Sequence, residues 1–206
     1  MSVDDIVTVN NIKRAWRFLL DNIDYPVDWQ YIREYNRIIG EGRVRDAGRL
    51  REYGVRIGVT GWVPEIPAVE SSQERVRGIL EESEGEDTAM LLFGAVTRGQ
   101  WFSDGNKRTA LMVANHQLIH DGIGVFSIPP EDKAQFVSML LRYYETGDYS
   151  RLSDWLSPNA VGHVPGGLTL AQSSGVVEKT NDAVNGMGTV PGVPLDGLDG
   201  GSGLLR

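Results

Sequence analysis

The sequence contains no cysteine, which excludes a disulfide framework, a thiolate metal site and a cysteine nucleophile. It also lacks any run approaching the roughly 18 consecutive apolar residues of a membrane-spanning helix. Its first five residues, MSVDD, are acidic where a secretory signal would be basic. We therefore expect a cytoplasmic protein that does not contact a membrane.

Positive charge is in deficit. The chain has 20 Lys and Arg residues against 28 Asp and Glu residues, a formal net charge of −8. Such a surface disfavours binding along a nucleic-acid backbone, where neutralised phosphates supply most of the affinity, and docking on an anionic lipid leaflet. The composition therefore predicts no nucleic-acid partner and no membrane partner.

Aromatic side chains are missing from the C-terminal quarter of the chain. The last one is Trp155, and the 48 residues of 159–206 contain 11 glycines. A segment of this composition buries too little apolar surface to offset the entropy of ordering it. We expect a helical domain over 1–158 and a flexible, mostly disordered Gly-rich tail over 159–206.

Apolar residues recur every three or four positions through most of 1–158, which is typical of amphipathic helices. The pattern predicts helices over 12–23, 29–39, 71–80, 87–96, 106–119, 129–146 and 149–156. One segment, 53–64, instead alternates β-branched residues with others between glycines. We expect an all-α fold on which this segment forms a short strand or β-hairpin flap, the alternative being an irregular loop.

The stretch 100–110 reads QWFSDGNKRTA and lies between two predicted helices. Its Asp-Gly-Asn turn begins the second helix, where unpaired N–H groups and the helix dipole favour an anion. Gly105 allows a close backbone approach, and Lys107 and Arg108 add positive charge that a helix N-terminus otherwise disfavours. Asp104 is placed to hold a magnesium ion beside a phosphate. The alternative is a capped helix whose first-turn charges face solvent.

This stretch resembles the signature of the Fic/Doc (fido) family, His-x-Phe-x-Asp/Glu-Gly/Ala-Asn-Gly/Lys-Arg. The matching residues are Phe102, Asp104, Gly105, Asn106, Lys107 and Arg108. The continuation Thr-Ala-Leu is similar to the branch that includes the Doc toxins, and 47–67 is similar to the family's lead-in to its target-docking hairpin. The resemblance covers about 31–156.

The resemblance implies a Fic-type helical bundle with a small β-hairpin flap, and transfer of AMP from ATP (adenylylation) to a Ser, Thr or Tyr hydroxyl of a target protein. By position, Phe102 would anchor the loop, Asp104 would hold Mg²⁺, Arg108 would grip the terminal phosphates, and 105–107 would line the anion cradle. A flap would dock the target through Val55, Arg56, Ile57, Gly58 and Val59. ATP and Mg²⁺ are the expected cofactors. The similarity to the Doc branch also predicts an antitoxin-like partner.

Two positions depart from the family pattern. Gln100 stands where the family has its catalytic histidine; a neutral amide cannot act as a general base, whose loss costs about 10²–10⁴-fold in rate. Leu111 stands where many members carry an arginine. The Doc branch also lacks this arginine, and its members phosphorylate their target. The sequence thus leaves four readings open: a weakened adenylyltransferase, an inactive nucleotide- or partner-binding regulator, a Doc-like kinase toxin, and a helical interaction module.

No other histidine is expected to replace the missing base. At 1.5 Å per helical residue, His116 and His120 lie roughly 15–21 Å beyond Asn106, and His163 falls in the predicted tail. The sequence from Ser174 to Glu178 is similar to the family's inhibitory motif, but Lys179 follows it. Since the arginine that such a glutamate pairs with is also replaced, we interpret this match as chance.

Overall fold

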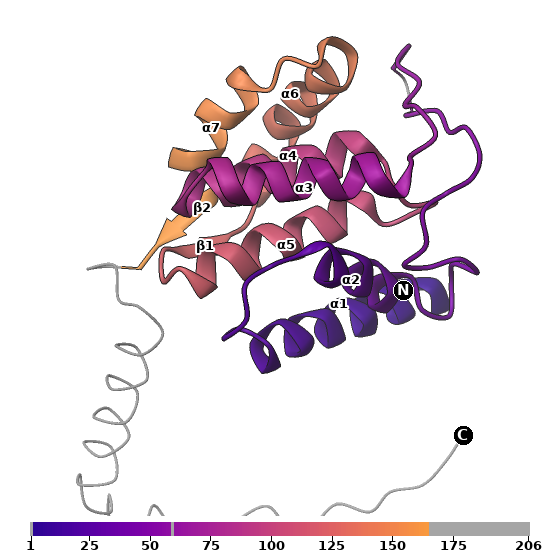
Figure 1. Cartoon of the computed structure of the whole chain (residues 1–206), viewed down its shortest axis with the longest axis horizontal. Coiled ribbons are helices and arrows are strands. Elements are labelled where there is room, and N and C mark those ends of the chain that lie inside the picture. The colour runs from indigo at the N-terminus through magenta and orange to yellow at the C-terminus, as the bar shows by residue number, and fades with distance from the viewer. Residues whose placement is uncertain (1, 59, 165–206) are drawn as a thin grey trace, which may run out of the picture. The chain divides into compact units, whose positions relative to one another are not determined.

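The structure is a computed structural model that describes residues 2–58 and 60–164 (Figure 1). Its elements, in chain order, are α1 (Val3–Asp21), α2 (Trp29–Gly40), α3 (Val69–Glu82), α4 (Gly85–Gly99), α5 (Asn106–His120), β1 (Gly124–Phe126), the 3₁₀ turn η1 (Pro130–Asp132), α6 (Lys133–Thr146), α7 (Ser150–Ala160) and β2 (Val161–His163). The predicted all-α class is confirmed, with one small antiparallel strand pair among the described residues. Within that part of the chain, none of the helices has the length and apolar character needed to cross a membrane.

The core forms around α4 and α5, which pack side by side (Figure 1). α2 packs on α5 and carries α1, while α3 and α7 pack on α4. Both central helices are buried on most sides, in line with the continuous apolar run that predicted α4. The loop between them therefore has both ends anchored in the most buried part of the molecule.

The first two helices begin at side-chain caps. The Asp28 carboxylate accepts a hydrogen bond from the Tyr31 N–H (2.9 Å), as its predicted N-cap role requires. α1 begins nine residues before the predicted 12–23 because Ser2 and Asp5 form a reciprocal capping box. The apolar pattern missed this first part of α1, since Val3 and Ile6 face solvent.

The predicted strand or hairpin over 53–64 is wrong for the residues that the structure describes. Residues 51–58 and 60–68 form a loop up to the start of α3, with a turn closed by the Thr60 N–H and the Ile57 carbonyl (2.9 Å). Side-chain N–H groups of Arg51 occupy the carbonyls of Tyr53 and Glu65, which therefore bond to a guanidinium instead of a second strand. The alternative of an irregular loop is the one observed.

The strand pair lies elsewhere, between β1 and β2, with Gly124 opposite His163 and Phe126 opposite Val161. α7 continues through Pro158, and β2 follows it directly. Regular structure thus extends beyond the boundary predicted after residue 158. The rest of the predicted tail, including the match from Ser174 to Glu178, lies outside the described residues.

Candidate functional site

Two left-handed residues shape the loop that joins α4 to α5. Gln100 ends α4 at φ 44°, and Gly105 precedes α5 at φ 81°. A side chain at residue 105 would also be crowded, because its Cβ would lie 3.2 Å from Ile39 Cγ2 and 3.3 Å from Asn36 Nδ2. Glycine is therefore required at 105 by both backbone and space.

Asn106 holds the loop closed. Its Nδ2 donates to the Phe102 carbonyl (2.8 Å), and its Oδ1 accepts from the Phe102 N–H (3.0 Å). Phe102 is itself buried in the core. The Asn106 amide is thus occupied within the loop, which leaves the backbone N–H of Asn106 as its free contribution to an anion site.

Asn36, on α2, holds the outer side of the same loop. Its Nδ2 donates to the Asp104 carbonyl (2.9 Å) and to Thr109 Oγ1 (3.1 Å), while its Oδ1 accepts from the Gly48 N–H (2.9 Å). Our reading of the sequence missed this residue. The available signal was a polar residue among the apolar positions that α2 buries.

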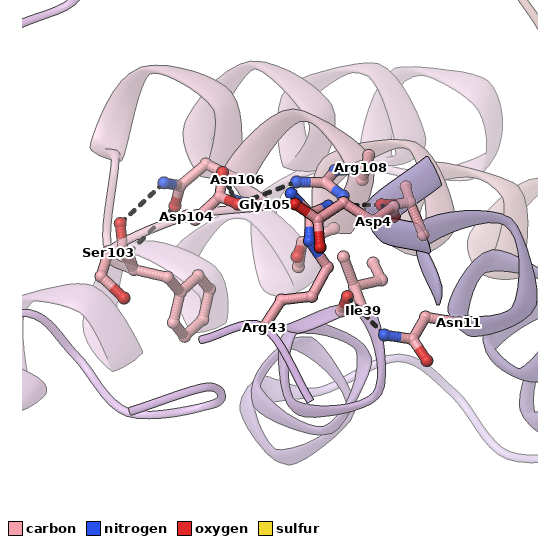
Figure 2. Close-up of polar contacts among 12 residues, drawn as sticks. Asp4, Asn11, Ile39, Arg43, Ser103, Asp104, Gly105, Asn106 and Arg108 are labelled. Carbon is pink, nitrogen blue, oxygen red and sulfur yellow. Dashed lines mark hydrogen bonds and ion pairs between the residues drawn. The ribbon is translucent and has the colours of Figure 1, made fainter. Parts of the chain in front are cut away.

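Asp104 and Arg108 point toward each other across the first turn of α5 (Figure 2). Asp104 Oδ2 lies 3.1 Å from Arg108 Nη2, and Asp104 Oδ1 accepts from the Gly105 N–H (2.6 Å). The Asp104 side chain is 53 % exposed and that of Arg108 29 %, so the ion pair contributes at most about 1 kcal/mol. Asp104 thus accepts from two donors at the start of α5 while its side chain stays half exposed to solvent. Lys107 is exposed beside it.

Gln100, which the sequence resemblance places at the position of a catalytic base, has both ends of its amide engaged. Nε2 donates to the Thr97 carbonyl (2.6 Å), and Oε1 accepts from Asn106 Nδ2 (3.3 Å). The Tyr144 hydroxyl lies beside it, and burial raises the pKa of Tyr144 well above its ordinary value, with the Gln100 hydrogen bond opposing the rise. Neither side chain can take a proton from a substrate at neutral pH.

Arg51 connects this loop to the irregular segment formed by residues 52–58 and 60–68, which we call the flap loop. Our reading of the sequence assigned Arg51 no role. Although its side chain is charged, the residue is only 1 % exposed, and burial lowers its pKa. Nε donates to the Gln100 carbonyl (2.6 Å), Nη1 donates to the Tyr53 carbonyl (2.6 Å), and Nη2 donates to that of Glu65. Arg51 therefore connects the start and the end of the flap loop to Gln100.

The predicted target-docking residues lie in this flap loop. Val55 and Ile57 are half-buried, whereas Arg56 and Gly58 are exposed. Val59 lies outside the described residues. Arg51 brings the start and the end of the loop beside Gln100, and no strand edge is formed among 55–58.

The three histidines lie away from Gln100. His116 is fully buried: Nδ1 lies 2.7 Å from the Tyr35 hydroxyl and Nε2 lies 2.9 Å from the Tyr25 carbonyl, so Nε2 carries the donated proton. Burial lowers the pKa of His116. His120 contacts the Ile23 carbonyl. His163 Nε2 lies 2.6 Å from Glu86 Oε2, at the opposite end of α4, about 20 Å along the helix from Gln100.

Within the described residues no group of three or more histidine, aspartate or glutamate side chains could hold a metal ion. Asp104 is the acidic residue of the loop and is half exposed. Mg²⁺ is commonly held by one or two carboxylates together with phosphate oxygens and water. The site therefore fits Mg²⁺ when a nucleotide supplies the remaining oxygen ligands, and does not fit it as a protein-only metal site.

Comparison with solved structures identifies the fold. A fragment of Fic-1 from C. elegans matches with a TM-score of 0.67 at 18 % identity, over 90 % of this chain and 53 % of that one. A variant of the same fragment matches with a TM-score of 0.62 at 18 % identity, over 89 % and 53 % of the two chains. A Fic-domain signalling protein from Bacteroides thetaiotaomicron matches with a TM-score of 0.59 at 18 % identity, over 76 % and 69 %.

These matches show that the chain has the helical fold of Fic-domain proteins. The chain spans about half the length of the C. elegans fragment that it matches. No protein-family model matches the sequence, and no curated protein matches it.

Proposed function

We propose that this protein binds the phosphates of ATP at the N-terminus of α5 and slowly transfers AMP to a hydroxyl of a target protein. The observation that carries the proposal is the loop over 100–108. Gly105 and Asn106 fix the shape of its turn, and two cations flank the unpaired N–H groups at the start of α5. These cations serve no evident structural purpose, since Lys107 is exposed and Arg108 pairs with a half-exposed carboxylate.

The reaction defines what each residue would do. The target oxygen forms a bond to the α-phosphorus, the bond from that phosphorus to the pyrophosphate oxygen breaks, and the hydroxyl proton passes to an acceptor. The N–H groups of α5 and Arg108 would stabilise negative charge on the phosphates. Asp104 would hold Mg²⁺, which supplies further charge neutralisation there. Gln100 offers no proton acceptor, so water must take the proton and transfer is slow.

Titration calorimetry with ATP and Mg²⁺ tests the binding step. We expect measurable affinity, and a loss of at least tenfold in Arg108→Ala, because a bidentate charge-assisted contact is removed. Arg77→Ala, on an exposed face of α3, is the matched control and should bind as wild type does. No heat at millimolar ATP, or equal affinity in wild type and Arg108→Ala, would refute nucleotide binding here.

Restoring the base tests the transfer step. Gln100→His should raise auto-modification by about 10²-fold or more with little change in ATP affinity, because histidine is tolerated in left-handed backbone. Gln100→Ala, which frees the same amide contacts without adding a base, should gain nothing. Label from α-³²P-ATP on the protein identifies AMP transfer, whereas label from γ-³²P-ATP alone identifies the kinase alternative.

A second candidate, a nucleotide-binding regulator without transfer activity, is favoured by the double engagement of the Gln100 amide. It predicts that wild type and Gln100→His both bind ATP and that neither labels itself or a lysate protein.

A further inference from the structure

A hollow of about 730 Å³ lies beside the base position but outside the α5 cradle. It is bounded by the flap loop from Trp62 to Pro67, the start of α3, the end of α4, and Tyr143 on α6. Its volume falls within the ~300–1,000 Å³ of ordinary ligand sites. Gly99 and Trp101 both line it, so it adjoins the position of Gln100.

The charge of this hollow is opposite to that of the whole chain. Its lining carries Arg75 and Arg98 against one carboxylate, Glu65, whereas the chain has a net charge of −8. Neither arginine forms an ion pair with a carboxylate of the described residues. Arginines that line a cavity and have no carboxylate partner are suited to a planar anionic group such as a carboxylate or a phosphate.

Both arginines line the same hollow as Tyr143. Burial raises the pKa of the Tyr143 hydroxyl, and the positive charges of Arg98 and Arg75 oppose that rise. Arg98 is held in place: its Nε donates to the Tyr143 carbonyl (3.2 Å), and its guanidinium carbon lies 4.6 Å from the Trp62 ring centre. Arg75, from α3, is exposed and makes no ion pair with the described residues, so it is free to close on a ligand.

The rim of the hollow is apolar and exposed. Val63 is 54 % exposed and Ile66 is 56 % exposed, and both line the same hollow as the arginines. Free phosphate or a nucleotide phosphate would leave these two side chains without a contact. A peptide that places an anionic side chain next to an aliphatic one would contact both the cations and the rim.

We propose that this hollow docks a segment of a partner protein that carries a carboxylate side chain beside an aliphatic residue. The anionic group lies between Arg75 and Arg98, and the aliphatic residue packs on Val63 and Ile66. Docking requires no nucleotide, so the inference goes beyond the proposed function, and either can fail without the other.

Fluorescence polarisation of the full chain tests the docking. The probes are a labelled peptide of three Glu-Val repeats, its phosphoserine-Val analogue and its Gln-Val analogue. We expect the Glu peptide to bind at least tenfold more tightly than the Gln peptide, and binding of the phosphoserine peptide alone would overturn the carboxylate as the docked group. Arg75→Gln should weaken binding of the Glu peptide about tenfold or more, as expected for a charge-assisted contact, and Glu65→Gln should strengthen it severalfold.

Arg77→Gln is the matched control, because Arg77 lies two residues along α3, pairs with Glu74 and Glu81, and does not line the hollow. It should leave peptide binding unchanged. Equal binding of the Gln peptide, no binding of any peptide at millimolar concentration, or equal losses in Arg75→Gln and Arg77→Gln would overturn the proposal. Displacement of the peptide by ATP at its own binding affinity would also overturn it, by showing that the hollow is a nucleotide site. In contrast, Arg75→Gln should leave the ATP affinity measured by calorimetry unchanged. This result distinguishes failure of the docking proposal from failure of ATP binding at α5.

Discussion

Asp104 is a carboxylate inside the anion cradle that we propose, and removing its charge has a calculable effect on nucleotide binding. It accepts from the Gly105 N–H and pairs with Arg108, two of the donors that a phosphate would use. A phosphate on these donors lies close to the carboxylate. Two unit charges about 4 Å apart repel by about 1 kcal/mol at the dielectric constant of water and about 4 kcal/mol near a protein surface. Because the Asp104 side chain is half exposed, the lower end of this range applies.

We therefore expect Asp104→Asn to bind Mg²⁺-free ATP about tenfold more tightly than wild type, which corresponds to about 1.4 kcal/mol. In wild type, Asp104 would hold Mg²⁺ beside the phosphates, and the charge of the ion would offset this repulsion. The ratio of the ATP dissociation constants without and with Mg²⁺ should therefore fall in Asp104→Asn.

Titration calorimetry of both proteins with ATP, in excess EDTA and then in excess Mg²⁺, measures all four constants. Asp46→Asn is the matched control, because Asp46 accepts a hydrogen bond from Ser103 of the same loop (2.7 Å) but does not contact the donors of α5. Weaker binding of Mg²⁺-free ATP by Asp104→Asn, or the same dependence on Mg²⁺ in both proteins, would refute the reasoning.

Two further predictions concern stability. The pKa of His116 is lowered in the folded protein by burial, so the unfolded chain takes up the proton first as the pH falls below about 6.5. The free energy of unfolding should therefore decrease from pH 7.5 to pH 5.5 in urea titrations, and His116→Gln should show a smaller decrease; equal slopes would contradict this. A chain ended after Asn159 should be less stable than one ended after Val164 by about 1.5 kcal/mol or more, since it loses β2 and the buried Val161, and coincident thermal melting curves of the two chains would contradict that expectation.

Apart from the first part of α1, local information in the sequence was enough for the helices and for the turn that starts α5. The helices follow from the spacing of apolar residues, and the N-cap at Asp28 needs a donor only three residues away. Gly105 takes a left-handed conformation before α5, which a glycine in a turn signals from the sequence alone. These features depend on contacts within one or two turns of chain, which is why the pattern predicts them.

The side chains that hold the loop over 100–108 in place bond to residues far away in the sequence. Asn36 reaches Asp104 and Thr109 across about 70 residues of chain, and Arg51 reaches Gln100 across 49. The predicted flap strand failed for the same reason: its β-branched alternation is real, but Arg51 takes the carbonyls of Tyr53 and Glu65. No periodicity in the sequence shows which buried polar group will take which carbonyl.

The contacts around Gln100 explain how the loop keeps its shape. The Gln100 amide joins the last turn of α4, through Thr97, to the first residue of α5, through Asn106, while Arg51 holds its carbonyl. The same position separates the two sites proposed above, since its neighbours Gly99 and Trp101 line the cationic hollow and Asn106 begins the cradle. A partner segment docked in the hollow would therefore present its flanking residues at Gln100, next to a nucleotide held by α5. Positioning alone can accelerate a reaction between two bound groups by several orders of magnitude, so slow transfer without a base is consistent with this arrangement.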